Sequence, residues 1–311
     1  MKEKILLDTD IGTEVDDAIT LAYLLANPDA DLMGITTVTG EAVQRARLAS
    51  VLCRIAGKEI PIFPGCENPI LISQSERWAP QASILDKWDH QDDFPVNQAV
   101  PFLQRTIREN PGQITLIGIA PLTNLALLFL IDPEIPSLLK KLVLMCGSPE
   151  YTRCDGAGEK MSAMECGQQM SLASKGILEN NALIDPHAAK IVYNAPVKTH
   201  CTVGLNVTSR LIQKPEAAEQ LFASPLLLPV LDIAKEWFKD EKRITFHDPL
   251  AAVSVFHPEV CKFENGKIEV ETQSQGLSGF TYWRRDENGP HAVATDVDAD
   301  LFFRCLFEQM K

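Results

Sequence analysis

The sequence predicts an α/β protein with a mostly parallel central sheet and helices on both faces. Short runs typical of β-strands alternate with helical patterns through the first two-thirds of the 311 residues. This alternation is typical of parallel sheets, whose strands are joined by helices. No linker, internal repeat or low-complexity tract interrupts the chain. We therefore expect residues 1–311 to form a single domain.

The elements follow from hydrophobic periodicity. Strands are expected in that alternating part at residues 4–7, 31–38, 114–119, 141–146 and 197–203. Helices are expected between them at residues 17–25, 42–56, 98–108, 123–130 and 186–193. After about residue 209 the pattern becomes a helical excursion, with helices at 215–222, 226–238 and from 247 onward. Strands return at 262–271 and 279–283, before a closing helix at 296–310.

Composition limits the class of partner. The net charge of −13 argues against a nucleic acid or an anionic membrane, because both favour a positive protein surface. A neutral small molecule stays compatible with this charge. No segment predicts a signal peptide or a membrane span, and the eight cysteines form no Cys-x-x-Cys pair. We therefore expect a cytoplasmic protein with reduced, mostly buried thiols.

Four aspartates within ten positions directly follow the first apolar run. They are Asp8, Asp10, Asp16 and Asp17, and the last two open a helical pattern. Converging carboxylates repel one another unless a cation or protons neutralise them. In parallel sheets, ligands bind outside the carboxyl ends of the strands, which is where this turn lies. The sequence therefore predicts a divalent-metal site after the first strand.

Residues 148–176 form a long, weakly periodic segment rich in Gly, Ser, Met and Gln. Loops of this length inside compact domains are usually lids or binding loops. A disordered insertion is the alternative.

Several further blocks accompany the acidic turn in a fixed order. They read Thr36-Thr37-Val38, Pro121-Leu122-Thr123-Asn124, Glu179-Asn180-Asn181 with Asp185-Pro186, Gly204-Leu205-Asn206-Val207-Thr208, and His247-Asp248-Pro249-Leu250. Together with Asp8-Thr9-Asp10-Ile11-Gly12 and Asp16-Asp17-Ala18, this arrangement resembles the inosine-uridine-preferring nucleoside hydrolases. The resemblance covers most of the chain and implies a Rossmann-like fold of the nucleoside hydrolase type.

The resemblance implies a calcium ion, which prefers six to eight oxygen ligands. Asp10, Asp17 and Asp248 would supply carboxylates, and Thr123 its backbone carbonyl. Asp248 before Pro249 also reads as a helix N-cap, and Thr123 as the cap of the following helix. Asp16, Glu179 and Asn181 match the family's ligands of the ribose hydroxyls.

The implied reaction is hydrolysis of the N-glycosidic bond of a ribonucleoside. Asp10 would act as general base on a metal-bound water. His247 is the candidate acid for the leaving base, or else it only orients its neighbours, and His90 is a second candidate. A nucleoside partner and a homodimer or homotetramer are expected by resemblance alone.

The chain departs from the family pattern at three places. Two extra residues within Thr13-Glu14-Val15 lengthen the acidic turn, Glu41 stands where asparagine commonly follows glycine, and Ala173 stands where an amide ligand is expected. An ionised carboxylate can only accept hydrogen bonds, so Glu41 would suit a sugar hydroxyl or a cationic substituent. Alternatively, Glu41 only starts a helix and points to solvent.

Other functional classes remain open. The altered ribose positions are compatible with a ribonucleoside-binding relative, or with a hydrolase of modified nucleosides. A haloacid-dehalogenase-type phosphatase also begins with a strand and an Asp-x-Asp turn, but it would not need Asp16-Asp17 or His247-Asp248. An EF-hand is excluded by spacing, because the sixth and twelfth positions from Asp8 are Thr13 and Ile19.

Overall fold

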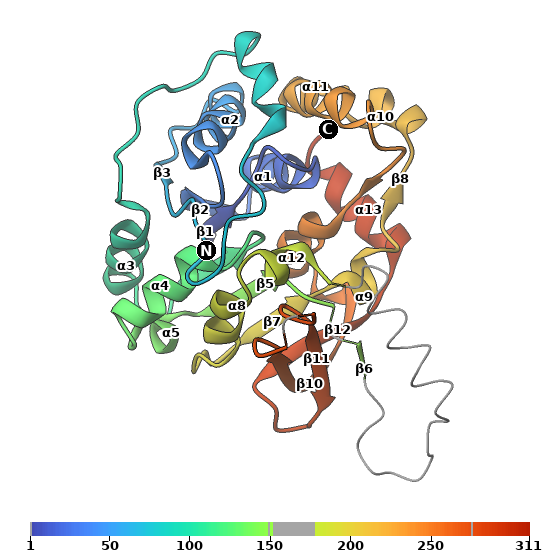
Figure 1. Ribbon diagram of the computed structural model, residues 1–311. Helices are drawn as coiled ribbons and strands as arrows, with labels where there is room; N and C mark the ends of the chain where they lie inside the picture. Colours follow the sequence, from blue (N-terminus) through green and yellow to red (C-terminus); the bar gives the residue numbers. More distant parts are fainter. Residues whose placement is uncertain (1, 149, 152–177, 275) are drawn as a thin grey trace.

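The computed structural model describes residues 2–148, 150–151, 178–274 and 276–311 (Figure 1). The strands are β1 (Glu3–Thr9), β2 (Ala30–Thr37), β3 (Ile62–Pro64), β4 (Ile114–Gly118), β5 (Lys141–Met145), β6 (Glu150–Tyr151), β7 (His200–Val203), β8 (Ile212–Gln213), β9 (Ile244–Thr245), β10 (Cys261–Val270), β11 (Thr281–Arg285) and β12 (His291–Val297). The α-helices are α1 (Asp16–Ala26), α2 (Ala42–Ile55), α3 (Ala99–Glu109), α4 (Thr123–Ile131), α5 (Ile135–Leu138), α7 (Asn180–Ile184), α8 (Pro186–Tyr193), α9 (Leu205–Thr208), α10 (Pro215–Leu221), α11 (Leu228–Trp237), α12 (His247–Phe256) and α13 (Ala299–Glu308).

One large sheet runs through the described part of the chain, in the order β3-β2-β1-β4-β5-β7-β12-β10-β11-β6. The strands from β3 to β12 pair in parallel, whereas β10 is antiparallel to both of its neighbours, β12 and β11. The mostly parallel sheet predicted from the strand-helix alternation is confirmed. Strands β8 and β9 form a separate small antiparallel pair.

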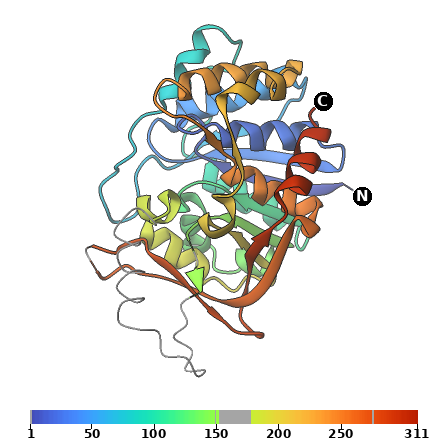
Figure 2. The same ribbon diagram turned by 90° about the vertical axis from the view of Figure 1, so that its right-hand side faces the viewer.

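Helices cover both faces of this sheet, and Figure 2 shows the two layers from the side. Side chains of β1 alternate between the faces, as the pleat of a strand requires. Ile5 and Leu7 pack in the core beneath α1, α2, α11, α12 and α13, whereas Leu6 packs in the core beneath α3, α4 and α8. All three side chains are fully buried, which explains the continuous apolar run read from the sequence.

Five of the described strands were absent from the sequence prediction: the short strands β3, β6, β8 and β9, and the longer strand β12. The short strand β3 lies at the sheet edge, and β12 lies between β7 and β10. The alternation in His291–Val297 is broken by Thr295 and Asp296, so the pairing with β7 and β10 defines this strand more than its pattern does. The closing helix accordingly begins at Ala299 rather than near residue 296. Asp298 caps that helix by accepting a hydrogen bond from the Leu301 amide at 3.0 Å.

The predicted lid or binding loop at 148–176 falls almost entirely on residues 149 and 152–177, which lie outside the described residues. Ala173 lies there as well. The cysteines at the described positions are free, and all but Cys66 are buried. Within the described ranges, no helix is both long and apolar enough to span a membrane.

Candidate functional site

A cavity of about 170 Å³ opens at the carboxyl ends of the parallel strands. Ile119 and Met145, at the ends of β4 and β5, and Leu205, just after β7, form its apolar part. The other lining residues are mostly acidic or amide side chains: Asp10, Thr13, Glu14, Asp16, Asp17, Glu76, Leu178, Glu179, Asn180, Asn181, His247 and Asp248. This is the sheet edge at which the acidic turn was expected.

The turn after β1 carries the first carboxylates of the cavity. Gly12 has a φ of +121°, and an added Cβ there would lie 2.8 Å from Leu48, so the turn requires glycine. The Thr9 hydroxyl, at the end of β1, donates to Asp17 at 2.5 Å and accepts from the Ile11 amide at 3.2 Å. These contacts fix the path of the turn from the strand to the first turn of α1.

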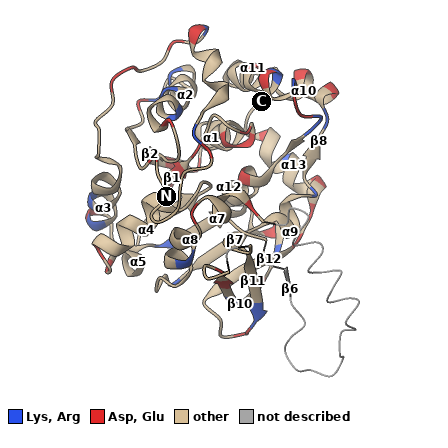
Figure 3. Cartoon of the chain, viewed as in Figure 1, with Lys and Arg blue, Asp and Glu red and all other residues tan. Residues whose placement is uncertain are grey.

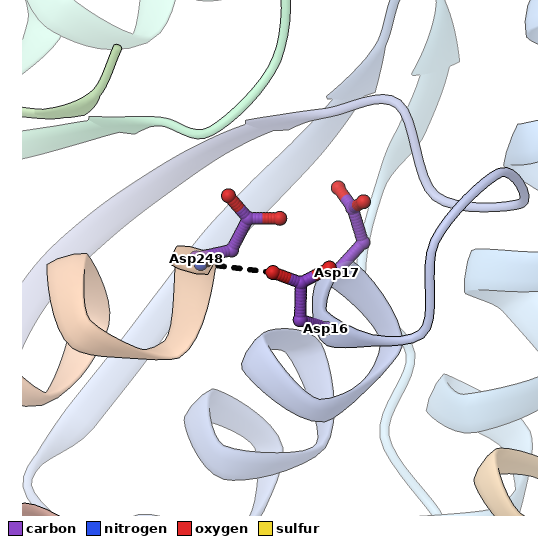
Figure 4. A group of neighbouring side chains, drawn as sticks. All are labelled: Asp16, Asp17 and Asp248. Atoms are coloured by element: carbon purple, nitrogen blue, oxygen red, sulfur yellow. Dashed lines mark hydrogen bonds between the residues drawn. The ribbon is translucent and has the colours of Figure 1, made fainter. Parts of the chain in front are cut away.

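Three carboxylates from two distant segments meet in this cavity. Each of Asp16, Asp17 and Asp248 offers one oxygen, and these oxygens lie within 4.8 Å of one another. Figure 4 shows Asp16 and Asp17 on the first turn of α1, facing Asp248 on the first turn of α12. Figure 3 shows the start of α1 in red on the ribbon, beside α12.

Asp16 also joins the two helices directly. Its Oδ2 accepts hydrogen bonds from the backbone amides of His247 at 2.9 Å and Asp248 at 3.2 Å. Amides at the start of a helix have no partner within the helix. Asp16 therefore caps α12 from a position 231 residues earlier in the chain, and Asp248 lies in the first turn instead of forming the cap.

Burial raises the pKa of each carboxyl in this group. The pKa of Asp17 rises to about 7, because of burial and then because of the charge of Asp16. Burial and the neighbouring aspartates place the pKa of Asp248 well above its usual range, and burial also raises the pKa of Asp16. A divalent cation would neutralise this repulsion, and carboxylate oxygens are the ligands that hard cations prefer.

Asp10 lines the same cavity but does not belong to the trio. Asp16, which the family resemblance assigned to the ribose hydroxyls, does belong to the trio. The pKa of Asp10 is raised well above its ordinary value by burial and by the charge of Asp17. Thr123 begins α4, and its hydroxyl donates to Asp185 at 2.8 Å. Thr123 is not among the described residues that line the cavity.

Glu179 and Asn181 lie side by side in the wall of the cavity. Glu179 caps α7, accepting from the amides of Asn181 at 2.7 Å, Ala182 at 3.0 Å and Gly147 at 2.7 Å. The Asn181 amide group donates to the carbonyl oxygens of Ile119 at 3.2 Å and Met145 at 3.0 Å. These bonds turn the amide NH₂ of Asn181 toward the strand ends.

His247 is the histidine that the structure brings to the cavity. Its Nδ1 lies 2.7 Å from the Thr208 hydroxyl, which in turn lies 3.1 Å from the Gly204 carbonyl. The Thr208 hydroxyl has one proton for these two neighbours, so its direction determines which nitrogen of a neutral His247 ring carries hydrogen. Burial lowers the pKa of His247, which favours that neutral ring.

The structure places His90 and Glu41 outside the cavity. His90 Nδ1 lies 2.8 Å from the Trp88 carbonyl, and its Nε2 lies 3.5 Å from Asp92. Glu41 lines a different surface pocket, and its carboxylate accepts from the Ala79 amide at 2.8 Å. Glu41 adopts a left-handed backbone with a φ of +60°, directly before α2.

Glu14, Glu76 and Arg45 were not predicted as site residues. Glu14 lies in the lengthened turn, so its position was visible in the sequence. Glu76 comes from an irregular segment that gives no periodic signal. Arg45 stands on the buried face of α2 together with Ala42, Ala46 and Ala49, and a charge on an apolar helix face was the signal available for it.

Comparisons with known proteins agree with the motifs. The model of the inosine-uridine preferring nucleoside hydrolase family matches residues 5–304. A pyrimidine-specific ribonucleoside hydrolase, RihA, of Escherichia coli (strain SMS-3-5 / SECEC) is 29% identical, covering 99% of this chain and 98% of its own length.

Solved structures share the fold. A purine-preferring ribonucleoside hydrolase from Gardnerella vaginalis is similar with a TM-score of 0.79 and 20% identity, over 99% of this chain and 98% of the other. An inosine-guanosine nucleoside hydrolase gives a TM-score of 0.80 at 20% identity, over 100% of this chain and 99% of the other.

Proposed function

The chain belongs to the inosine-uridine-preferring nucleoside hydrolase family, and from this premise we propose that it hydrolyses the N-glycosidic bond of ribonucleosides. The products would be ribose and the free base. The observation that carries the proposal is that Asp10, the trio Asp16, Asp17 and Asp248, and the remote residues Glu179, Asn181 and His247 all line one cavity.

The metal of this site is proposed to be calcium, held by Asp10, Asp17, Asp248 and the carbonyl of Thr123. The support is the all-oxygen donor set and the closeness of Asp17 and Asp248 within the trio. A bound calcium ion would hold the ribose diol and lower the pKa of water beside it. The residues themselves would bind the sugar, with Asp16, Glu179 and Asn181 facing its hydroxyls.

In the proposed reaction, the oxygen of a water molecule bonds to C1′ of the ribose while the bond from C1′ to the base nitrogen breaks. Asp10 accepts the proton that the water loses. The departing base takes up a proton, and His247 is the proposed donor. In this step the protonated ring of His247 would donate from Nε2, while its Nδ1 hydrogen is bonded to the Thr208 hydroxyl, and the ring is left neutral.

The preferred base is a separate question. The relatives are named for pyrimidine, purine and inosine-guanosine substrates, so their names support no single choice. A modified nucleoside, or binding without turnover, is the second candidate. This second candidate is favoured by the lengthened acidic turn, because that turn places Glu14 in the cavity.

A homodimer or homotetramer in the cytoplasm is proposed on the family resemblance alone. Analytical ultracentrifugation and cell fractionation would test these two points.

The decisive experiment is ribose release from a panel of nucleosides, including uridine, cytidine, inosine, guanosine and modified nucleosides. Each would be assayed with calcium and with a chelator. Calcium-dependent ribose release supports the proposal. Tight nucleoside binding without ribose release would favour the binding-only alternative, and phosphate release from phosphomonoesters would favour a phosphatase.

A further inference from the structure

Among the described residues, Arg45 has the largest side chain that is completely buried. It lies on α2 among small apolar residues, with none of its surface exposed. A buried guanidinium is costly unless its donors are paired, because it loses its hydration. The hydrogen-bond partners of Arg45 therefore indicate which parts of the structure it stabilises.

The guanidinium contacts three separate segments of chain. Nη1 donates to the carbonyl of Asp10, contacts that of Ile11 at 3.4 Å and lies 3.0 Å from the Thr13 hydroxyl. Nε donates to the Gly40 carbonyl at 2.8 Å, just before α2. Nη2 donates at 3.2 Å both to the Glu76 carboxylate and to the Trp78 carbonyl.

Two of these segments form walls of the cavity. The turn after β1 contributes Asp10, Thr13 and Glu14, and the segment around residue 76 contributes Glu76. Direct bonds between the walls join the same network, because the Thr13 hydroxyl donates to Glu76 at 2.6 Å. Gln81 adds two more hydrogen bonds. Its backbone N–H donates to the Gly12 carbonyl at 3.0 Å, and its side-chain Nε2 donates to the Thr13 carbonyl at 2.9 Å.

We propose that Arg45 is a positioning residue, which fixes the acidic turn, and with it Asp10, against the wall that carries Glu76. This inference rests on the proposed function for its effect on turnover. The planar fork of arginine can reach three segments at once, which a lysine ammonium cannot do. Because Arg45 lies behind the walls, its loss should affect the placement of Asp10 more than the binding of the nucleoside.

The first test does not depend on activity. Hydrogen exchange of the metal-free protein would compare wild type with Arg45→Lys and with Glu76→Gln, which keeps an acceptor for Thr13. Amides of residues 10–14 and 76–81 are expected to exchange at least about ten-fold faster in Arg45→Lys, which corresponds to about 1.4 kcal/mol of lost local stability. Glu76→Gln should act in the same direction with a smaller effect.

Arg47→Met is the matched control. Arg47 lies on the same helix, where it contacts Gln44 at 3.2 Å and the exposed Asp92 at 3.5 Å. The Arg47→Met substitution should leave the amide hydrogen-exchange rates of residues 10–14 unchanged. Unchanged exchange in Arg45→Lys, or an equal acceleration in Arg47→Met, would overturn the proposal whether or not nucleosides are substrates.

The second test separates positioning from substrate contact. On the best nucleoside of the panel, Arg45→Lys should lower kcat by about 10²-fold, as expected for a small displacement of a catalytic group, with KM changed less than about three-fold. The calcium dissociation constant should rise in parallel. A raised KM at unchanged kcat would instead assign Arg45 to substrate binding and contradict the proposal.

Discussion

Asp17→Asn should stabilise the metal-free protein at pH 8 while weakening its affinity for calcium. In the wild type, burial and the neighbouring Asp16 raise the pKa of Asp17 from its ordinary value of 3.8 to about 7. A carboxyl whose pKa is raised on folding binds its proton more tightly in the folded state. The free energy of unfolding therefore falls as the pH rises from the unfolded pKa toward the folded one.

The size of this effect follows from the shift. A change from 3.8 to about 7 costs about 4 kcal/mol at pH 8, at about 1.36 kcal/mol per pKa unit, and well under about 1 kcal/mol at pH 4. Asparagine keeps an oxygen that can accept from the Thr9 hydroxyl, but its amide NH₂ needs a partner, at a cost of about 1 kcal/mol. The net gain at pH 8 is therefore about 3 kcal/mol, or about 6 °C in Tm at about 2 °C per kcal/mol.

Thermal unfolding with a chelator at pH 4, 6 and 8 measures this directly. The gain in Tm should be large at pH 8 and disappear by pH 4, and added calcium should raise the Tm of the wild type more than that of the variant. Asp240→Asn, at an exposed turn, controls for the loss of one surface charge. An Asp17→Asn variant that is no more stable than wild type at pH 8, or equally stabilised at all three pH values, would refute the argument from carboxylate crowding.

Three further outcomes are expected. Asp10→Asn should lower kcat by about 10²–10⁴-fold, as expected for loss of a general base, and a near wild-type rate would remove Asp10 from the mechanism. Calcium affinity should increase from pH 6 to pH 8 with release of protons, because burial raises the pKa of Asp17 to about 7 and that of Glu14 to about 8; equal dissociation constants at the two pH values would contradict this. Glu41→Ala and Glu41→Asn should keep the wild-type order of preference among uridine, inosine and cationic-substituted nucleosides, because the carboxylate is already bonded to the Ala79 amide. A changed order would support the sequence-based proposal that Glu41 selects the substrate.

The parallel half of the fold was predictable because its strands are short, apolar and separated by amphipathic helices. Periodicity reports burial, and these strands are buried on both faces. Strand β12 was missed for the opposite reason, because much of it is only half-buried and its place depends on pairing with distant strands.

Within the candidate site, the residues in sequence motifs were likewise predictable, whereas those placed by long-range contacts were not. Asp10, Asp16, Asp17, Glu179 and Asn181 were found because they stand in ordered motifs, and all of them line the cavity. Glu76 could not be found in this way, because the hydrogen bonds of Thr13 and Arg45 bring it to the cavity from an irregular segment. Glu41 and His90 had persuasive local sequence contexts, but the backbone places both outside the cavity.

The capping of α12 by Asp16 has a consequence for how the protein is made. The two partners are separated by 231 residues, so a chain growing on the ribosome carries Asp16 and Asp17 long before the start of α12 exists. Contacts of such long sequence separation close late and slow folding. A nascent chain shorter than about 250 residues therefore cannot assemble the carboxylate trio, and its acidic turn stays hydrated. The proposed calcium binding would then report the docking of α12 on α1, and ribosome-stalled chains of increasing length should show a sharp onset of calcium affinity once α12 has emerged.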